Sequence, residues 1–162
     1  MAVNRQTYLC NDEAPGAPPL RLLLPAAAGS TRALKKGELA TMATGTLVAA
    51  VSGNTTGLVV IDQEQKSDDV ARHIWCIVPR PLDRFRYELS ASRQVAFGEQ
   101  FNISDSETLA YSAAGTNKVA RAAGNANRPL PEDESTTQRS VDYAEVYIDE
   151  QASYLAALTG NS

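Results

Sequence analysis

The stretch HIWCIVPRPLDRFRYEL, residues 73–89, decides the fold class of this chain. Its first part, 73–78, is a nearly continuous apolar run, which is typical of a central strand covered on both faces. Two prolines then end the run. Further on, Phe85, Tyr87 and Leu89 alternate with charged residues, which is the two-residue period of a half-buried strand. Two neighbouring strands of this kind predict a β-rich fold.

Short β-prone runs lie on both sides of this stretch and are separated by turns that contain glycine, asparagine or serine. These runs cover residues 38–42, 46–51, 57–62, 94–97, 100–103, 109–112, 118–122 and 141–148. Spacings of roughly 8–12 residues between such runs are typical of a meander, sandwich or barrel. The segment 109–121 is predicted as a hairpin closed at Gly115 and Asn117. Outside 149–158, no helical period of normal length is present.

We therefore predict a mostly β protein: a small β-barrel, β-tulip or sandwich with an extended N-terminal arm and a short C-terminal helix. Residues 1–30 are expected to form the arm, and 31–162 a single β-rich domain with a polar surface loop at about 124–138. The residues expected in the core are Val59, Ile61, Ile74, Trp75, Ile77, Phe85, Tyr87, Leu89, Val146 and Ile148.

The arm is predicted from the proline-rich segment APGAPP, residues 14–19. Proline fixes φ and removes a backbone donor, so this segment cannot hold a helix or a central strand. Two short apolar pieces, 7–10 and 20–24, flank it. Such a segment fits an extended arm that lies on another surface. It fits equally a frayed terminus with one edge strand, and the sequence leaves both interpretations open.

The formal net charge of -4 argues against general nucleic-acid binding, which is usually accompanied by a basic excess. No apolar run is long enough to cross a bilayer, and we expect neither a signal peptide nor a membrane partner. The two cysteines, Cys10 and Cys76, are far apart and match no metal or redox spacing. We expect them to be free thiols in a reducing cytoplasm.

Catalytic chemistry would have to use His73, because it is the single histidine. It stands beside the strand that looks most buried, where a structural histidine is the better interpretation. A metal site would pair it with Asp68 and Asp69, but that spacing matches no standard site. We therefore predict no catalytic residue, no metal, no cofactor and no enzymatic activity.

Several segments together resemble the family of bacteriophage capsid decoration proteins, also called cement or head-stabilising proteins. They are KGELA (36–40), GTLVAA (45–50), TGLVV (56–60), VARA (119–122) and AEVYI (144–148). The resemblance is one of rhythm and composition over about residues 35–148. It implies a virion protein, made in the bacterial host cytoplasm, that binds the outer capsid surface and stabilises it by bridging capsomers. Its partner would be the major capsid protein, and it would form a homo-oligomer, a trimer in preference to a dimer.

Under this interpretation the N-terminal segment docks on the capsid. The docking residues would be Thr7, Tyr8, Leu9, Pro18, Pro19, Leu20, Leu22, Leu23 and Leu24, and the oligomer contact would use Tyr154, Leu155 and Leu158. Deletion of residues 1–19 is then expected to leave the fold intact and abolish attachment.

Two other functions remain as alternatives. Arg80, Arg84 and Arg86 lie close in sequence to aromatic residues, as in an OB-like barrel that binds single-stranded nucleic acid. A mostly β tail-tube or head–tail joining subunit would also fit the pattern.

Overall fold

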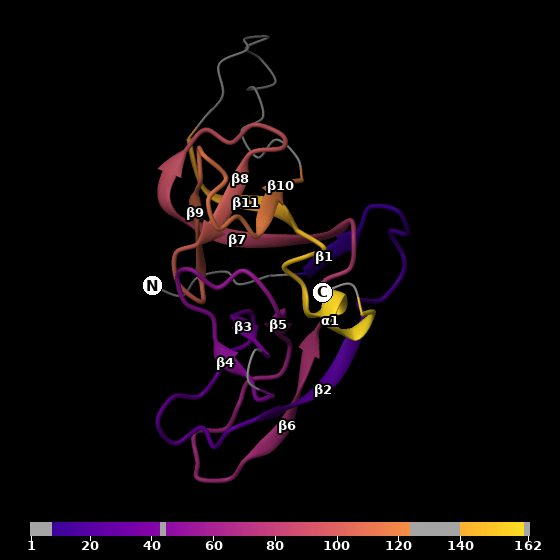
Figure 1. Cartoon of the computed structure of the whole chain (residues 1–162), viewed down its shortest axis with the longest axis vertical. Helices are drawn as coiled ribbons and strands as arrows, with labels where there is room; N and C mark the ends of the chain where they lie inside the picture. Colours follow the sequence, from indigo (N-terminus) through magenta and orange to yellow (C-terminus); the bar gives the residue numbers. More distant parts are fainter. Residues whose placement is uncertain (1–7, 43–44, 124–139, 161–162) are drawn as a thin grey trace.

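The structure, a computed structural model, describes residues 8–42, 45–123 and 140–160. Two sheets lie one above the other, with a short helix near their junction (Figure 1). The elements in chain order are β1 (Tyr8–Asn11), β2 (Arg21–Ala26), β3 (Leu39–Thr41), β4 (Val48–Ala49), β5 (Leu58–Ile61), β6 (Arg72–Ile77), β7 (Asp83–Arg93), β8 (Gln100–Ile103), β9 (Thr108–Tyr111), β10 (Ala120–Ala122), β11 (Val141–Ile148) and α1 (Tyr154–Leu158).

The upper sheet closes into a barrel. Its strand order is β1-β7-β11-β10-β8-β9, and a further parallel pairing of β7 with β9 joins the two ends. Strands β7, β11, β10, β8 and β9 thus form a closed five-stranded barrel, with β1 added at the outside of β7. The length of β7, 11 residues, allows this closure, since β7 pairs with β1 near its start and with β9 further along.

The lower sheet has the strand order β2-β6-β5-β3-β4. It curls, because an isolated parallel bridge between Ala26 and Leu47 brings its two ends together. The Leu47 N–H donates to the Pro25 carbonyl at 2.8 Å in this bridge. The prediction of a mostly β fold with a barrel and a short C-terminal helix is therefore confirmed.

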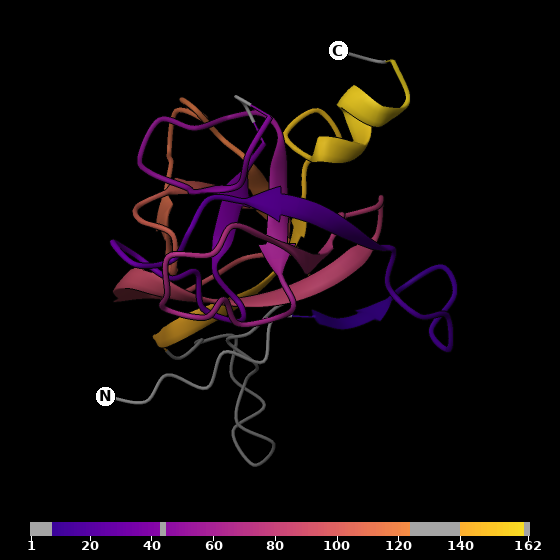
Figure 2. The ribbon, with the colours of Figure 1, turned by 90° about the horizontal axis from the view of Figure 1, so that it is seen from below.

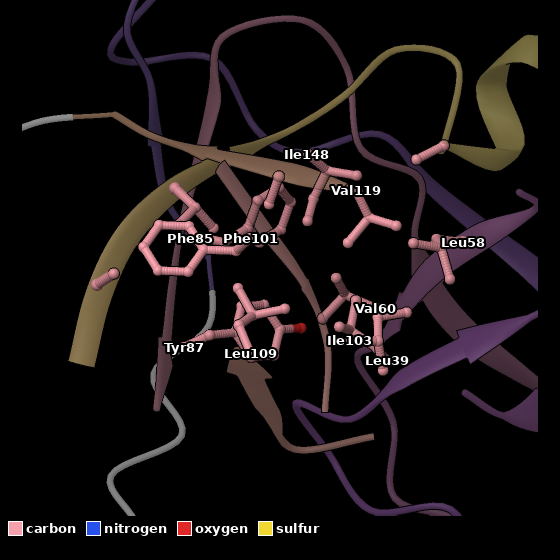
Figure 3. Close-up of a cluster of buried hydrophobic side chains, with 14 of the residues drawn as sticks. Leu39, Leu58, Val60, Phe85, Tyr87, Phe101, Ile103, Leu109, Val119 and Ile148 are labelled. Carbon is pink, nitrogen blue, oxygen red and sulfur yellow. The ribbon is translucent and has the colours of Figure 1, made fainter. Parts of the chain in front are cut away.

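Strands β3 and β5 form a wall between two hydrophobic cores. Leu39 and Val60 belong to the core that fills the barrel, whereas their neighbours Ala40 and Val59 belong to the core of the lower sheet. In Figure 3, Leu39 and Val60 lie beside Ile103 of the barrel, and Leu58 lies on the side of Val119. Successive side chains of a strand point to opposite faces, so one strand can serve both cores. The barrel and the lower sheet are consequently packed against each other through the side chains of β3 and β5.

Most of the predicted core is confirmed. Phe85, Tyr87 and Leu89 are buried inside the barrel, as their alternation predicts, and their charged neighbours lie on its outer side. The other buried members of the predicted set are Val59, Ile61, Ile74, Ile77, Val146 and Ile148. The prediction for Trp75 is wrong: it is 43% exposed. Strand β6 is central, between β2 and β5, but only its end near Ile77 is covered on both faces.

The N-terminal arm is a second correction. Residues 8–11 pair with β7 and residues 21–26 pair with β6 along the whole of β2, so both pieces are strands of the sheets. The alternative interpretation, an edge strand, describes β1 correctly. Pro25 is tolerated in β2 because β2 lies at the end of its sheet, where a missing N–H costs no ladder bond.

The predicted hairpin at 109–121 is also wrong, because β8 lies between β9 and β10 and pairs with both. Residues 94–97 form no strand, whereas the helix expected within 149–158 is present as α1. The polar loop expected at 124–138 lies outside the described residues.

Candidate docking surface

The predicted docking residues are divided between the two faces of β2. Leu24 is buried and Leu22 is half-buried, and both pack in the core of the lower sheet. Leu20 packs against the same core. By contrast, Leu23 points away from it and is 48% exposed. The alternation of a strand thus removes most of this segment from any external contact and leaves one leucine available.

The remaining predicted docking residues lie on β1 or in the connection to β2. Tyr8 and Leu9 are half-buried in β1, and the Tyr8 ring meets the Phe85 ring edge-on at 5.7 Å. Pro18 is exposed and Pro19 is half-buried. Thr7 lies outside the described residues.

Leu23 and Trp75 form an exposed apolar pair across β2 and β6. Their Cα atoms are register partners in the antiparallel ladder, so their side chains stand next to each other on one face. The Trp75 backbone is held by hydrogen bonds to Asp62 and Gln63, which follow β5. Its N–H donates to the Gln63 side-chain oxygen at 3.1 Å, and its carbonyl accepts from the Asp62 and Gln63 N–H groups. A tryptophan held in this way, with its ring partly in water, is suited to a protein contact.

Polar and small residues surround this pair. On one side, Arg21 forms an ion pair with Asp62, with 2.8 Å between the guanidinium Nε and a carboxylate oxygen. On the other side, Pro25 and the exposed His73 are register partners. The six residues Arg21, Leu23, Pro25, Asp62, His73 and Trp75 are called the β2–β6 face below. An apolar centre within a polar rim is the usual composition of a protein–protein contact.

Most residues of the predicted oligomer contact pack against the protein's own core. Tyr154 and Leu155 of α1 pack against the core of the lower sheet, whereas Leu158 is 48% exposed. Ser153 fixes the start of this helix: its hydroxyl donates to the Pro79 carbonyl at 2.6 Å and accepts from the Leu155 N–H. The helix therefore covers its own sheet, and Leu158 is the member that faces water.

A charged network joins β1 to the barrel. The Arg84 guanidinium lies 2.7 Å from a carboxylate oxygen of Asp12 and 3.2 Å from one of Glu145. The Tyr147 hydroxyl also donates to Asp12. Burial by itself raises the pKa of Asp12, but the bonds from Arg84 and Tyr147 outweigh it and hold this pKa below its usual range. No feature of the sequence identified this network, because Asp12 and Arg84 are far apart in the chain.

Two exposed features were also missed by the sequence. Phe97 is 75% exposed in the turn before β8. Leu82 has a φ of 65°, a left-handed conformation that leucine rarely adopts. It follows Pro81 in a turn where the Asp83 N–H donates to the Arg80 carbonyl at 3.1 Å.

The arrangement expected for nucleic-acid binding does not form among these residues. Phe85 and Tyr87 are buried, and Trp75 lies on the other sheet. Arg80 and Arg84 are each bound to carboxylates, Asp83 in the first case and Asp12 in the second. Arg86 lies over the Tyr143 ring, 5.0 Å from its centroid.

The residues considered for catalysis and metal binding do not form a common site. His73 is exposed, not the structural histidine expected from its neighbours, and Asp68 is bound to Arg72. In the described ranges, no group of three His, Cys, Asp or Glu side chains gathers in a way that could hold a metal ion. Both thiols are free, with Cys76 buried and Cys10 half-buried. None of the helices in the described ranges is long and apolar enough to span a membrane.

Comparison of the chain with protein-family models, with curated proteins and with solved structures gives no significant match.

Proposed function

We propose that this protein is a structural virion component that binds the outer surface of an assembled bacteriophage capsid and stabilises it by bridging capsomers. The observation that carries the proposal is the exposed pair Leu23–Trp75 at the centre of the β2–β6 face. An apolar pair that belongs to neither core contributes little to folding and is free to be buried by a partner.

Two further features support a scaffold that presents a surface. The barrel and the curled sheet share a wall of buried side chains, which makes a firm support for the β2–β6 face. The resemblance to decoration proteins, set out above, agrees with a mostly β body of this size. A capsid offers many identical positions, so a modest contact at each subunit is enough for full occupancy when neighbours also touch.

The nucleic-acid alternative receives less support. Aromatic side chains must stack on bases to bind a single strand, and Phe85 and Tyr87 are buried in the barrel. Two of the three arginines near them, Arg80 and Arg84, form ion pairs with carboxylates, and Arg86 lies over the Tyr143 ring. A tail-tube or head–tail joining subunit differs from a decoration protein in copy number, which the experiment below measures.

The test is a co-sedimentation assay. The purified chain is mixed with purified shells, the mixture is separated on a density gradient, and the chain is quantified against the major shell protein. We expect a high and fixed ratio. A trace of a few copies per particle would favour the joining function. Absence from the particles would exclude both virion functions and lead to a binding assay with a single-stranded oligonucleotide.

Three variants make the assay specific for the β2–β6 face. Leu23→Thr and Trp75→Thr remove the apolar pair but keep good strand formers. We expect each to lower the apparent affinity for shells by about tenfold or more, as for a central residue of a protein contact. Phe97→Thr is the matched control, because it removes a more exposed aromatic ring from the barrel and should bind as the unchanged protein does. Equal binding by all three variants would refute this docking surface.

Deletion of residues 1–19 is no longer a clean test of attachment. It removes β1, the Asp12 network and the Tyr8 ring that covers Phe85. We therefore expect that deletion to destabilise the barrel, in contrast to the expectation from the sequence.

A further inference from the structure

Strand β1 is attached to the barrel as a separate piece. In the part of the chain that the structure describes, it lies at one end of the upper sheet and pairs with β7. Its anchors are side chains: the Tyr8 ring on Phe85, the Asn11 amide on Asp83 at 2.9 Å, and the following Asp12 on Arg84. The residues that receive it belong to β7 and to the turn just before it, Pro81 and Leu82, with Tyr147 of β11 added.

The site that receives β1 is complementary in charge to it. Arg84 lies between Asp12 and Glu145 on the outer side of the barrel, so removal of β1 would leave one of its two carboxylate partners missing. Asn11 is 7% exposed and its amide donates both to Asp83 and to the Pro81 carbonyl. A strand without an Asn-Asp pair at these positions would lose the bonds to Asp83, to the Pro81 carbonyl and to Arg84, although Arg80 would still donate to Asp83 and Glu145 would still pair with Arg84. The site therefore selects the sequence of β1.

The connection from β1 to β2 folds back on β1: the Asn11 side-chain oxygen accepts from the Glu13 and Ala14 N–H groups, and the Tyr8 hydroxyl donates to the Ala17 carbonyl at 3.4 Å. Residues 12–20 contain three prolines, at positions 15, 18 and 19. In Figure 2 this segment forms a loop that projects away from the two sheets. A turn closed by the Ala17 N–H and the Ala14 carbonyl reverses its direction, and Arg80 donates to the Pro18 carbonyl at 2.9 Å. Prolines favour an extended chain, so the loop can open into a connection that reaches outward.

We propose that β1 is exchanged between copies of this chain, so that β1 of one copy pairs with β7 of a second copy. The contacts of β1 with β7 and with Tyr147 are preserved in the exchanged form, because the same residues meet the same site. The bond from the Tyr8 hydroxyl to the Ala17 carbonyl is lost when the loop opens. Exchange competes with pairing inside one chain, where the tethered β1 has an effective concentration of about millimolar for a short linker. Exchange is therefore favoured at high protein concentration. The inference concerns two copies of this chain and is independent of the proposed capsid function.

The first experiment traps β1 in its site. Arg84→Lys keeps the positive charge beside Asp12 and supplies an amine that a zero-length carbodiimide can join to the Asp12 carboxylate. Equal amounts of ¹⁴N- and ¹⁵N-labelled protein are mixed across a concentration series and then cross-linked. Mass spectrometry then reads the peptide pair that contains positions 12 and 84. We expect pairs of mixed isotope at high concentration and pairs of a single isotope on dilution.

A second variant removes the choice between the two arrangements. Deletion of residues 14–17 removes the turn that lets the connection fold back. We expect a dimer or larger closed assembly by light scattering, with mixed-isotope pairs at all concentrations. A variant with Pro15, Pro18 and Pro19 changed to alanine is the matched control and should exchange less. Single-isotope pairs at every concentration, together with a monomeric deletion variant, would overturn the proposal.

Discussion

The carboxylate of Glu38, which is fully buried, lies 2.6 Å from the guanidinium of Arg32. The Lys35 N–H and the Ser106 hydroxyl donate to the same carboxylate at 2.8 and 3.1 Å. Ser106 belongs to the turn between β8 and β9 of the barrel, whereas Glu38 immediately precedes β3 of the lower sheet. The Ser106 hydroxyl, which bonds to both members of this ion pair, therefore links the barrel to the lower half of the molecule.

Removal of the positive partner should be costly. Arg32→Ala leaves the Glu38 charge buried with fewer hydrogen bonds, and we expect the free energy of unfolding to fall by about 1–3 kcal/mol. The matched control is Arg72→Ala, which breaks the surface pair with Asp68 and should change the free energy of unfolding far less. Urea denaturation of both variants measures the difference. Equal losses would contradict the role given to the buried pair.

The same carboxylate predicts a loss of stability in acid. Burial by itself raises the pKa of Glu38, but the bonds from Arg32, the Lys35 N–H and Ser106, with the charge of Arg32, outweigh it and lower this pKa. A lowered folded-state pKa gives stability that is complete above the pKa of the unfolded chain, about 4.3. It is lost as the pH falls through the folded value. Denaturation between neutral pH and pH 3 should show this loss, and Glu38→Gln, although less stable at neutral pH, should show a shallower decline.

The sequence predicted those elements whose signal is local. The alternation of Phe85, Tyr87 and Leu89 is a property of one strand, and it identified the inner face of the barrel. Trp75 was misplaced because a nearly continuous apolar run has no alternation, so the sequence did not distinguish the outward residues of β6 from the inward ones. Burial on both faces begins only where β6 reaches the barrel core at Ile77.

The sequence did not predict which distant segments pair with each other. The turn near Gly115 was recognised, but a turn indicates a change of direction and does not name the partner strand; β8 separates β9 from β10. The prolines of residues 14–19 were read as the sign of an arm. They belong to the connection between β1 and β2, and β2 pairs with β6, which lies about 50 residues further along the chain. The β2–β6 face depends on that distant pairing, which is why Leu23 was predicted and its partner Trp75 was not.

The same substitution, leucine to valine, should destabilise the protein much more at Leu82 than at Leu23. Leu82 has a φ of 65° and is held there by bonds from Asp12 and Asn11 to the turn. A β-branched residue is more strongly excluded from this conformation, so Leu82→Val should lower the free energy of unfolding by about 1–2 kcal/mol. Leu23→Val, in an extended strand, should change it by no more than about 0.5 kcal/mol. Thermal unfolding of the two variants makes the comparison, and similar values would argue against strain at Leu82.

The two thiols should differ in reactivity. Burial raises the pKa of Cys76 to about 12, so the reactive thiolate is scarce at pH 8 and the sulfur is shielded from reagents. Cys10 is half-buried in β1 and is the thiol that should react in the folded protein. Iodoacetamide labelling followed by peptide mass spectrometry should find Cys76 modified only after denaturant is added. Rapid labelling of Cys76 in the native protein would contradict its place in the core of the lower sheet.

Trp75 provides an internal probe of docking, because it is the single tryptophan of the chain. Its ring is 43% exposed and lies beside Leu23, so the free protein should emit as a tryptophan in partial contact with water. Burial of the β2–β6 face against a shell would exclude that water and move the emission to shorter wavelength. Titration with purified shells should show this shift, saturating at a fixed ratio to the shell protein, and Leu23→Thr should require more shells to reach it. Binding by co-sedimentation without any change in emission would place the contact elsewhere on the molecule, with the surroundings of Phe97 as the next surface to alter.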